Sequence, residues 1–338
     1  MRIFNVVMNR ALGGLEQSFL DYNKVLEENG HGVVNITSSL AKLNKFVDSI
    51  KLPNLFPWCI ISKIYFKLLV MIYKPDVIIV HGGRAVNFAT AFYKNSAPVV
   101  GVTHSYSTKH ILKCDYLIAL DDSLKKQMVE NGYEKSKIFI TPNMITSGIQ
   151  KNVNIDKKLV VIGAMGRFVG QKGFKYLIDA IKMLSSKKYN VKLLLGGSGE
   201  LEMELKNQVI GLGIENFVEF VGWVSNKDKF FDEIDIFCIP STFETFGIVA
   251  LEAMARGMPI VATNAYGFVN IFDNYKDTII VNTKSSDEIA HAIEELIRTP
   301  KLASELGRNA YKKILDKYDE KIVGAEISRI LEKVTTLL

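Results

Sequence analysis

Short apolar segments alternate with amphipathic segments along the whole chain, and this alternation constrains the fold more than any other feature. It is typical of parallel β-sheets whose faces are covered by helices. Six strands are expected in the first half, near residues 3–8, 33–37, 77–81, 99–103, 116–120 and 138–141. Six more are expected in the second half, near residues 159–165, 191–195, 218–221, 234–239, 260–263 and 278–281. The polar residues 150–158 lack apolar periodicity and are interpreted as a linker.

The two series predict the α/β class, with two Rossmann-like doubly wound domains that face each other across a cleft. A chain of 338 residues with 48% hydrophobic residues is long enough to bury two such cores. Helices are expected at residues 15–27, 174–184, 201–211, 248–255, 287–298 and 302–338. We expect a first domain at 1–150, a second at 151–316, and a C-terminal helix at 317–338 that packs back on the first domain.

The formal net charge of +6 and the isoelectric point near 8.9 favour an anionic ligand or an anionic membrane surface, and charge alone does not choose between them. Cys59, Cys114 and Cys238 are scattered without paired spacing. They predict neither a disulfide framework nor a zinc site, and they suggest a reducing cytoplasm. Because the chain begins with a strand-like segment, no signal peptide is expected.

Residues 55–73 are the strongest candidate for membrane contact, because they are apolar and aromatic. Lys63 and Lys67 interrupt them, which argues against a helix that spans a bilayer. Two interpretations remain. The favoured one is a buried helix whose lysine stems run along apolar surface, and the other is an interfacial helix that touches lipid.

Two glutamates bracket the start of a predicted helix in the second half. Glu244 precedes the first turn, beside the backbone N–H groups of Thr245, Phe246 and Gly247, and Glu252 projects from about the second turn. A helix N-terminus is partly positive and suits a phosphate or a polyhydroxylated ligand. Carboxylates beside it can accept hydrogen bonds from sugar hydroxyls, so the pair could hold two sugar rings. The alternative is a solvated loop acid and a charge on a surface helix.

Basic side chains follow the first predicted strand of the second half. Arg167 comes directly after this strand and Lys172 five residues later, just before a helix. At the carboxyl end of a parallel sheet they could neutralise a diphosphate, or they could be two exposed loop cations. Glycine-containing turns at 196–199 and 222–224 end the next two strands and would line the same edge.

Gly13 and Gly14 follow the first strand and open a helix, so the backbone could approach a ligand there, although tight packing would also explain them. The three-glycine dinucleotide fingerprint is absent, which lowers the expectation of a nicotinamide enzyme. His104 ends a strand, as His81 does, and is either a reacting group or a structural hydrogen-bonding residue. No Asp-x-Asp motif or other metal-ligand spacing occurs, so no metal is expected.

Together these segments resemble glycosyltransferase family 4, the retaining glycosyltransferases of the GT-B fold. The matching segments are 13–16, His104, 142–143, 166–168 with 172–173, 196–199, 220–222, 243–247 and 251–259. The match is most specific in the last two, where seven residues separate Glu244 from Glu252. Met144 and Ile145 replace the glycine and acid usual in the family, and the segment after Asn35 is short.

The resemblance implies an acceptor-binding first domain and a nucleotide-sugar-binding second domain, with a role for each candidate residue. Arg167 and Lys172 would hold the donor diphosphate, aided by the backbone at Gly13 and Gly14 and by the helix N-terminus near Thr245, Phe246 and Gly247. Glu252 would accept from the ribose and Glu244 from the transferred sugar. Backbone around Val224 would meet the nucleobase, and His104 would lie against the transferred sugar or the acceptor.

The activity implied is retaining transfer of a hexose-type sugar without an obligatory metal and without a cofactor. The donor would be a nucleotide-diphosphate sugar, with UDP favoured over GDP, and the acceptor a hydroxyl of a glycan or glycolipid of lipopolysaccharide or capsule type. We expect a cytoplasmic protein without a nucleic-acid partner. In one interpretation, it also contacts an anionic membrane as a peripheral protein. The alternatives are a sugar-nucleotide epimerase or hydrolase on the same fold and a non-catalytic subunit.

Overall fold

The computed structural model of the protein describes residues 1–53, 59–91, 97–104, 109–148, 150, 155 and 158–337. The chain forms two compact units. The first unit comprises Met1–Met144 and Tyr318–Leu338, and the second comprises Ile145–Lys317. Most of the predicted linker, residues 151–154 and 156–157, lies outside the described residues.

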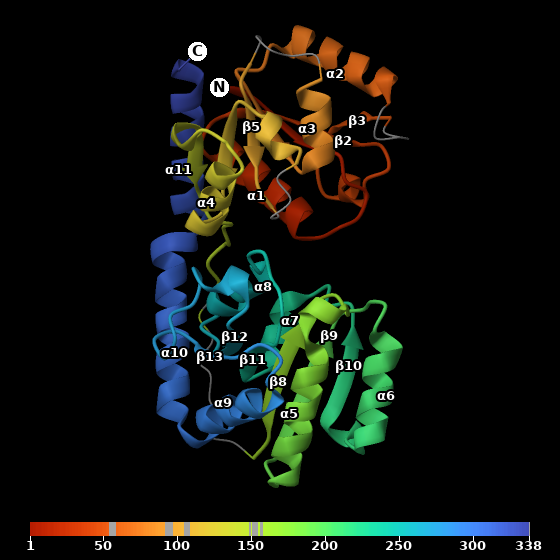
Figure 1. Ribbon diagram of the computed structural model, residues 1–338, viewed down its shortest axis with the longest axis vertical. Coiled ribbons are helices and arrows are strands. Elements are labelled where there is room, and N and C mark those ends of the chain that lie inside the picture. The colour runs from red at the N-terminus through yellow and green to blue at the C-terminus, as the bar shows by residue number, and fades with distance from the viewer. Residues whose placement is uncertain are drawn as a thin grey trace. The chain divides into compact units, whose positions relative to one another are not determined.

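The first unit is built on a parallel sheet of seven strands in the order β3-β2-β1-β4-β5-β6-β7 (Figure 1). The strands are β1 (Arg2–Val7), β2 (Gly32–Ser38), β3 (Ile50–Leu52), β4 (Val77–His81), β5 (Val99–Val102), β6 (Tyr116–Ala119) and β7 (Ile138–Ile140). The central strands are apolar and buried, as parallel sheets covered on both faces require. The sequence prediction omitted β3, whose three residues are too few to show a period.

Helices α1 (Gly14–Glu28), α2 (Ile60–Tyr73), α3 (Gly83–Ala89), α4 (Asp122–Glu130) and α11 (Glu320–Thr336) belong to the first unit. The C-terminal helix α11 packs on α1, as predicted. Gly324 makes this close approach feasible, because a Cβ there would lie 2.7 Å from the Cβ of Val25. Lys24 Nζ and Glu320 Oε2, 2.6 Å apart, join the two helices at the surface.

The second unit has a six-stranded parallel sheet in the order β10-β9-β8-β11-β12-β13. The strands are β8 (Val160–Met165), β9 (Val191–Gly196), β10 (Val218–Gly222), β11 (Ile236–Ile239), β12 (Ile260–Thr263) and β13 (Ile279–Val281). The helices are α5 (Phe174–Ser186), α6 (Glu202–Leu212), α7 (Lys227–Glu233), α8 (Ile248–Met254), α9 (Ser286–Arg298) and α10 (Pro300–Lys313). In Figure 1, α5 and α9 lie side by side against the sheet. The apolar faces of these two helices pack with the strands into the hydrophobic core of the second unit.

Two predictions need correction. Residues 302–338 are not one helix, because a π-helical turn at Ile314–Tyr318 separates α10 from α11 and Asp319 caps the new helix by accepting from Lys321 N. The favoured interpretation of 55–73 as a buried helix is also wrong. Residues 55–58 lie outside the described residues, and α2 exposes several of its apolar side chains. No helix among the described residues is long and apolar enough to cross a membrane.

Candidate active site

Three neighbouring strands of the second unit end in loops that are hydrogen-bonded to one another. Gly166 N donates to Gly196 O at 3.0 Å, and Gly197 N donates to Gly222 O at 2.7 Å. Gly197 has a φ of +133°, and a Cβ there would lie 1.9 Å from Gly166 O. Only glycine allows this contact, so these glycines fix the loops as one layer at the carboxyl edge of the sheet.

Arg167 lies exposed in this layer, between residues that are held tightly. The ring of its neighbour Phe168 is buried and meets Phe174 edge to face, with ring centroids 5.4 Å apart. Phe168 N donates to Ser198 O at 2.9 Å. The backbone at Arg167 is therefore fixed while its guanidinium faces solvent.

Lys172 is brought to Glu244 by contact between the β8–α5 and β11–α8 loops. Thr242 N donates to Gln171 O at 2.8 Å. Gly173, with a φ of +65°, comes so close to Pro240 that a Cβ would lie 2.0 Å from the proline carbonyl oxygen. As a result, Lys172 Nζ donates to Glu244 Oε2 in an ion pair whose side chains are both largely buried.

The main chain at Glu244 is held by the loop that follows β12. Gly267 N donates to Glu244 O at 3.1 Å, and a Cβ on Gly267 would lie 2.5 Å from that oxygen. Gly247, with a φ of +77°, then turns the chain into α8. Since Ser241 Oγ also donates to Glu244 Oε2 at 3.4 Å, the carboxylate is oriented by a cation and a hydroxyl.

Glu252 lies on α8 with only 5% of its surface exposed and forms an ion pair with Lys227, the first residue of α7. Asn226 caps α7 by accepting from Lys229 N at 3.0 Å, which fixes the position of Lys227. Arg256 adds a second support, because it donates to Glu252 O at 3.0 Å and lies over the Phe231 ring at 4.6 Å. Lys227 is not among the predicted site residues, although the Asn–Lys–Asp–Lys run at 226–229 is a recognisable helix start.

Val224 lies at the same edge, since a Cβ on Gly196 would come 2.5 Å from Val224 Cγ2. The second unit thus brings together Arg167, Lys172, Val224, Glu244 and Glu252 with Thr245, Phe246 and Gly247. Gly13, Gly14 and His104 belong to the first unit. There, Gly13 and Gly14 follow β1, and His104 follows β5. The carboxyl ends of β1, β4 and β5 lie at the same edge of the parallel sheet.

His104 belongs to a chain of polar side chains in the first unit. Its Nε2 lies 3.0 Å from His81 Nδ1, and His81 Nε2 lies 3.0 Å from Asn5 Oδ1. Burial lowers the pKa of His104 to about 4. Burial, and then the neighbouring His104, lower the pKa of His81 well below its usual value. Both rings are therefore neutral at pH 7.

The hydrogen bonds assign the tautomers of both rings. Asn5 Nδ2 donates to Phe19 O at 3.2 Å, so Asn5 Oδ1 is the atom that faces His81 Nε2, and this nitrogen must carry the proton. His81 Nδ1 then accepts from the Nε2–H of His104. The remaining nitrogen of His104, Nδ1, is left as an acceptor for a hydroxyl. Among the described residues, no group of three or more His, Cys, Asp or Glu is arranged to hold a metal ion.

Residues 147–313 match the family model described as glycosyl transferases group 1. The capsular polysaccharide biosynthesis glycosyltransferase CapM of Staphylococcus aureus is 31% identical over 226 residues, which cover 62% of this chain and 60% of CapM. The lipopolysaccharide core biosynthesis glycosyltransferase LpsE of Rhizobium meliloti is 26% identical over 270 residues, covering 77% of each chain. The chain thus spans less than two thirds of CapM.

The fold resembles that of Anabaena HepE, whose crystal structure was determined in complex with UDP and glucose. The TM-score is 0.85 at 20% sequence identity, and the alignment covers 98% of this chain and 100% of HepE. This likeness confirms the predicted two-domain α/β fold of the GT-B type.

Proposed function

We propose that the protein is a retaining glycosyltransferase, because residues 147–313 match the family model of the glycosyl transferases group 1. It transfers a hexose-type sugar from a nucleotide-diphosphate sugar, with UDP favoured over GDP, to a hydroxyl of a glycan or glycolipid acceptor. The acceptor belongs to a capsule or lipopolysaccharide type of polymer, as the names of CapM and LpsE suggest for those proteins. The protein works in the cytoplasm, where nucleotide sugars are made.

The observation that carries this proposal is the Lys172–Glu244 ion pair beside Arg167 at the edge of the second sheet. A diphosphate would compete for Lys172, because it carries more negative charge than one carboxylate and offers more acceptor oxygens. Arg167, exposed in the glycine-rich layer, would bind the same group. Glu244, released from Lys172, would then accept hydrogen bonds from the hydroxyls of the transferred sugar.

Glu252 would bind the ribose in a similar way. Its carboxylate is nearly buried and is neutralised by Lys227, whose side chain is more exposed. Ribose hydroxyls that donate to Glu252 would displace the lysine toward solvent. The backbone at Val224 would meet the nucleobase, and the N–H groups at Thr245, Phe246 and Gly247 would add donors for the phosphates.

Transfer needs stabilisation of the negative charge that grows on the leaving diphosphate. Arg167 and Lys172 would provide it as preorganised cations, so the reaction needs no metal ion. A phosphate oxygen of the leaving group would take the proton of the acceptor hydroxyl on the face where the new bond forms, which retains the anomeric configuration. In the first unit, Gly13 and Gly14 would leave room for the phosphates, and His104 Nδ1 would accept a hydrogen bond from a hydroxyl of the transferred sugar or the acceptor.

The proposal is tested in two steps. Thermal shift assays with UDP, GDP and ADP should show stabilisation by one nucleotide at least, since a ligand that binds only the folded state raises its stability. Incubation of that nucleotide's sugars with glycan and glycolipid acceptors should then yield a product whose anomeric configuration, read by NMR, is that of the donor. An epimerised or hydrolysed donor would support the epimerase or hydrolase reading instead, and inverted product would contradict the mechanism.

A further inference from the structure

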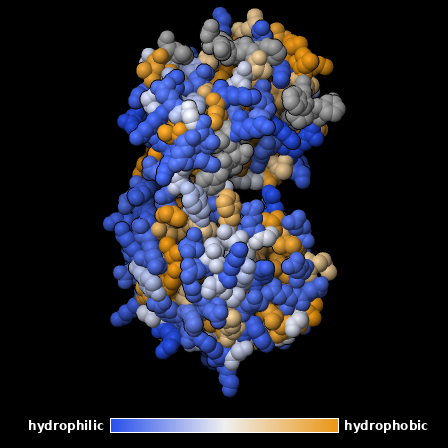
Figure 2. Space-filling view, viewed as in Figure 1, coloured by the Kyte–Doolittle hydropathy of each residue, from blue (hydrophilic) through white to orange (hydrophobic). Residues whose placement is uncertain are grey.

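Helix α2 presents an uncovered apolar face. Seven of its large apolar side chains are exposed, with Ile60, Ile61, Met71 and Ile72 each more than 60% exposed. These side chains, at positions 60, 61, 64, 65, 68, 71 and 72, occupy a continuous arc of about 140° at about 3.6 residues per turn. Figure 2 shows hydrophobic residues gathered over this helix at the top of the view. An exposed patch of this kind marks a contact surface.

The opposite face of α2 anchors the helix to the first unit. Phe66, Leu69 and Val70 are buried, and the Phe66 ring meets Phe4 of β1 edge to face with centroids 6.2 Å apart. The exposed arc is therefore held outward by a packed inner face, and the side chains that form it take no part in the core.

The polar residues of α2 are all basic or neutral. Lys63 and Lys67 lie along one margin of the apolar arc, Lys74 follows the last turn, and residues 59–75 contain no Asp or Glu. A helix with an apolar face and a lysine margin matches the boundary of an anionic bilayer, where the acyl chains take up the apolar side chains and the headgroups pair with the lysines.

From this combination we propose that α2 is a membrane-contact helix that lies in the interface of a bilayer rich in anionic lipid. At 14 residues it is about 21 Å long, shorter than the hydrocarbon core of about 30 Å, so it lies in the plane of the interface. A second copy of the chain fits this face less well, because two α2 helices packed together would place no acidic group opposite their lysines. Membrane contact would bring the first unit to a glycolipid acceptor.

The test is flotation of the full-length protein with vesicles of phosphatidylcholine alone or mixed with phosphatidylglycerol, without donor or acceptor. Binding should require the anionic lipid and weaken at high salt. Ile61→Gln with Ile72→Gln, and separately Lys63→Glu with Lys67→Glu, should each lower vesicle binding about tenfold or more. All four side chains lie on or beside the exposed arc, so the fold should not change; melting temperatures check this.

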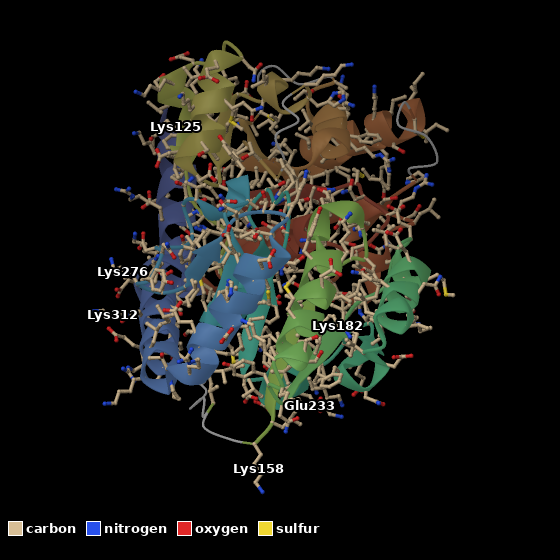
Figure 3. The ribbon with its side chains drawn as sticks, turned by 60° about the horizontal axis from the view of Figure 1, so that its bottom comes forward. Lys125, Lys158, Lys182, Glu233, Lys276 and Lys312 are labelled. Carbon is tan, nitrogen blue, oxygen red and sulfur yellow. The ribbon has the colours of Figure 1, made fainter. Side chains whose placement is uncertain are left out.

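Matched controls lie on the second unit. Met203→Gln with Ile210→Gln removes two exposed apolar side chains from α6, and Lys312→Glu reverses a charge that projects from α10 (Figure 3). Neither should alter vesicle binding by more than about twofold. An Ile64→Trp variant should also show a blue-shifted emission with vesicles and quenching by lipids brominated in the acyl chain.

The proposal would be overturned if the α2 variants bound vesicles as well as wild type does. It would also be overturned if brominated lipids left the fluorescence of Ile64→Trp unquenched. Sedimentation of the lipid-free protein provides a further check. A wild-type dimer that Ile61→Gln with Ile72→Gln converts to a monomer would show that a second copy covers the face instead. Because no substrate is present, these outcomes are independent of the glycosyltransferase proposal.

Discussion

Both glutamates of the candidate site contact a lysine, but their surroundings differ. Glu252 lies inside α8 and is nearly buried, whereas Glu244 precedes the helix and is partly exposed beside Ser241. We expect Glu252→Gln to weaken binding of free nucleoside diphosphate and of nucleotide sugar alike, because both ligands contain the ribose that Glu252 would bind. Glu244→Gln should leave diphosphate affinity within about twofold and lower turnover about tenfold or more, because contacts to the reacting sugar strengthen in the transition state.

Calorimetry with nucleoside diphosphate, together with steady-state rates, distinguishes the two variants. Equal loss of diphosphate affinity in both would contradict the division of roles. The Gln replacements preserve shape and hydrogen-bonding atoms, so a change in melting temperature of more than a few degrees would mark a folding effect.

His104 should give a measurable dependence of stability on pH. Its pKa is about 4 in the folded state and near 6.5 when unfolded. Between these values the unfolded chain binds more protons, so the free energy of unfolding falls as pH drops from about 6.5 to about 4 and is unaffected by this group above that window. The slope due to His104 reaches at most about 1.4 kcal/mol per pH unit.

In His104→Gln this contribution is absent, and the stability difference from wild type should shift steadily in favour of the variant as pH falls through that window. Urea unfolding at intervals of half a pH unit measures it. His81→Gln is the companion variant, since burial also lowers the pKa of His81. Parallel curves for wild type and His104→Gln would show that His104 is not held neutral.

At the scale of single elements, the close contact between the ends of β8 and β9 should tolerate no side chain at Gly197. Gly197→Ala would place a Cβ against Gly166 O in a backbone region that favours glycine. We expect it to destabilise the protein by about 2 to 4 kcal/mol and to weaken donor binding, since the loop that carries Arg167 must move. Thermal unfolding and nucleotide titration measure both effects.

Gly211→Ala is the matched control. Gly211 lies in α6 with nothing within 4 Å of an added Cβ, so alanine should be neutral or stabilise by about 0.5 to 1 kcal/mol. A Gly197→Ala variant as stable as Gly211→Ala would mean that the layer is not rigid.

Most strands could be predicted to within two residues, because buried parallel strands are continuous apolar runs between loops rich in glycine and charge. Three features of the fold could not be predicted from the sequence. Strand β3 has only Ile50 and Leu52 as apolar signal, and the π-helical turn at Ile314–Tyr318 keeps the helical pattern while shifting its register. The apolar arc of α2 resembles a core face in composition, and only tertiary packing decides which side of a helix is covered.

Arg167, Lys172 and Glu244 follow the ends of parallel strands, so the sequence alone predicts that they lie at one edge of the second sheet. The ion-pair partners of these site residues could not be predicted. Lys227 is 25 positions from Glu252, and the pairing depends on how α7 and α8 pack. The hydrogen-bonded chain from His104 through His81 to Asn5 likewise joins the loop after β5 to strands β4 and β1, which no local sequence pattern predicts.

For the molecule as a whole, the proposed reaction needs no metal ion, because the positive charge of Arg167 and Lys172 would take the role that a divalent metal ion has in other transferases. We therefore expect sugar transfer to continue in the presence of EDTA at no less than about half its rate. Loss of activity that Mg²⁺ or Mn²⁺ restores would show that a metal ion, bound by substrate or protein, is required.

The most direct test of the account is calorimetric titration of nucleoside diphosphate into wild type, Arg167→Ala, Lys172→Ala and the double variant. Each single change should cost about 1.5 to 3 kcal/mol of binding free energy, the range for hydrogen bonds to charged groups. The double variant should show no measurable binding, whereas Lys312→Ala, on the surface of α10, should bind as wild type does. Wild-type affinity in the double variant would contradict the assignment of the donor diphosphate to this edge of the second sheet.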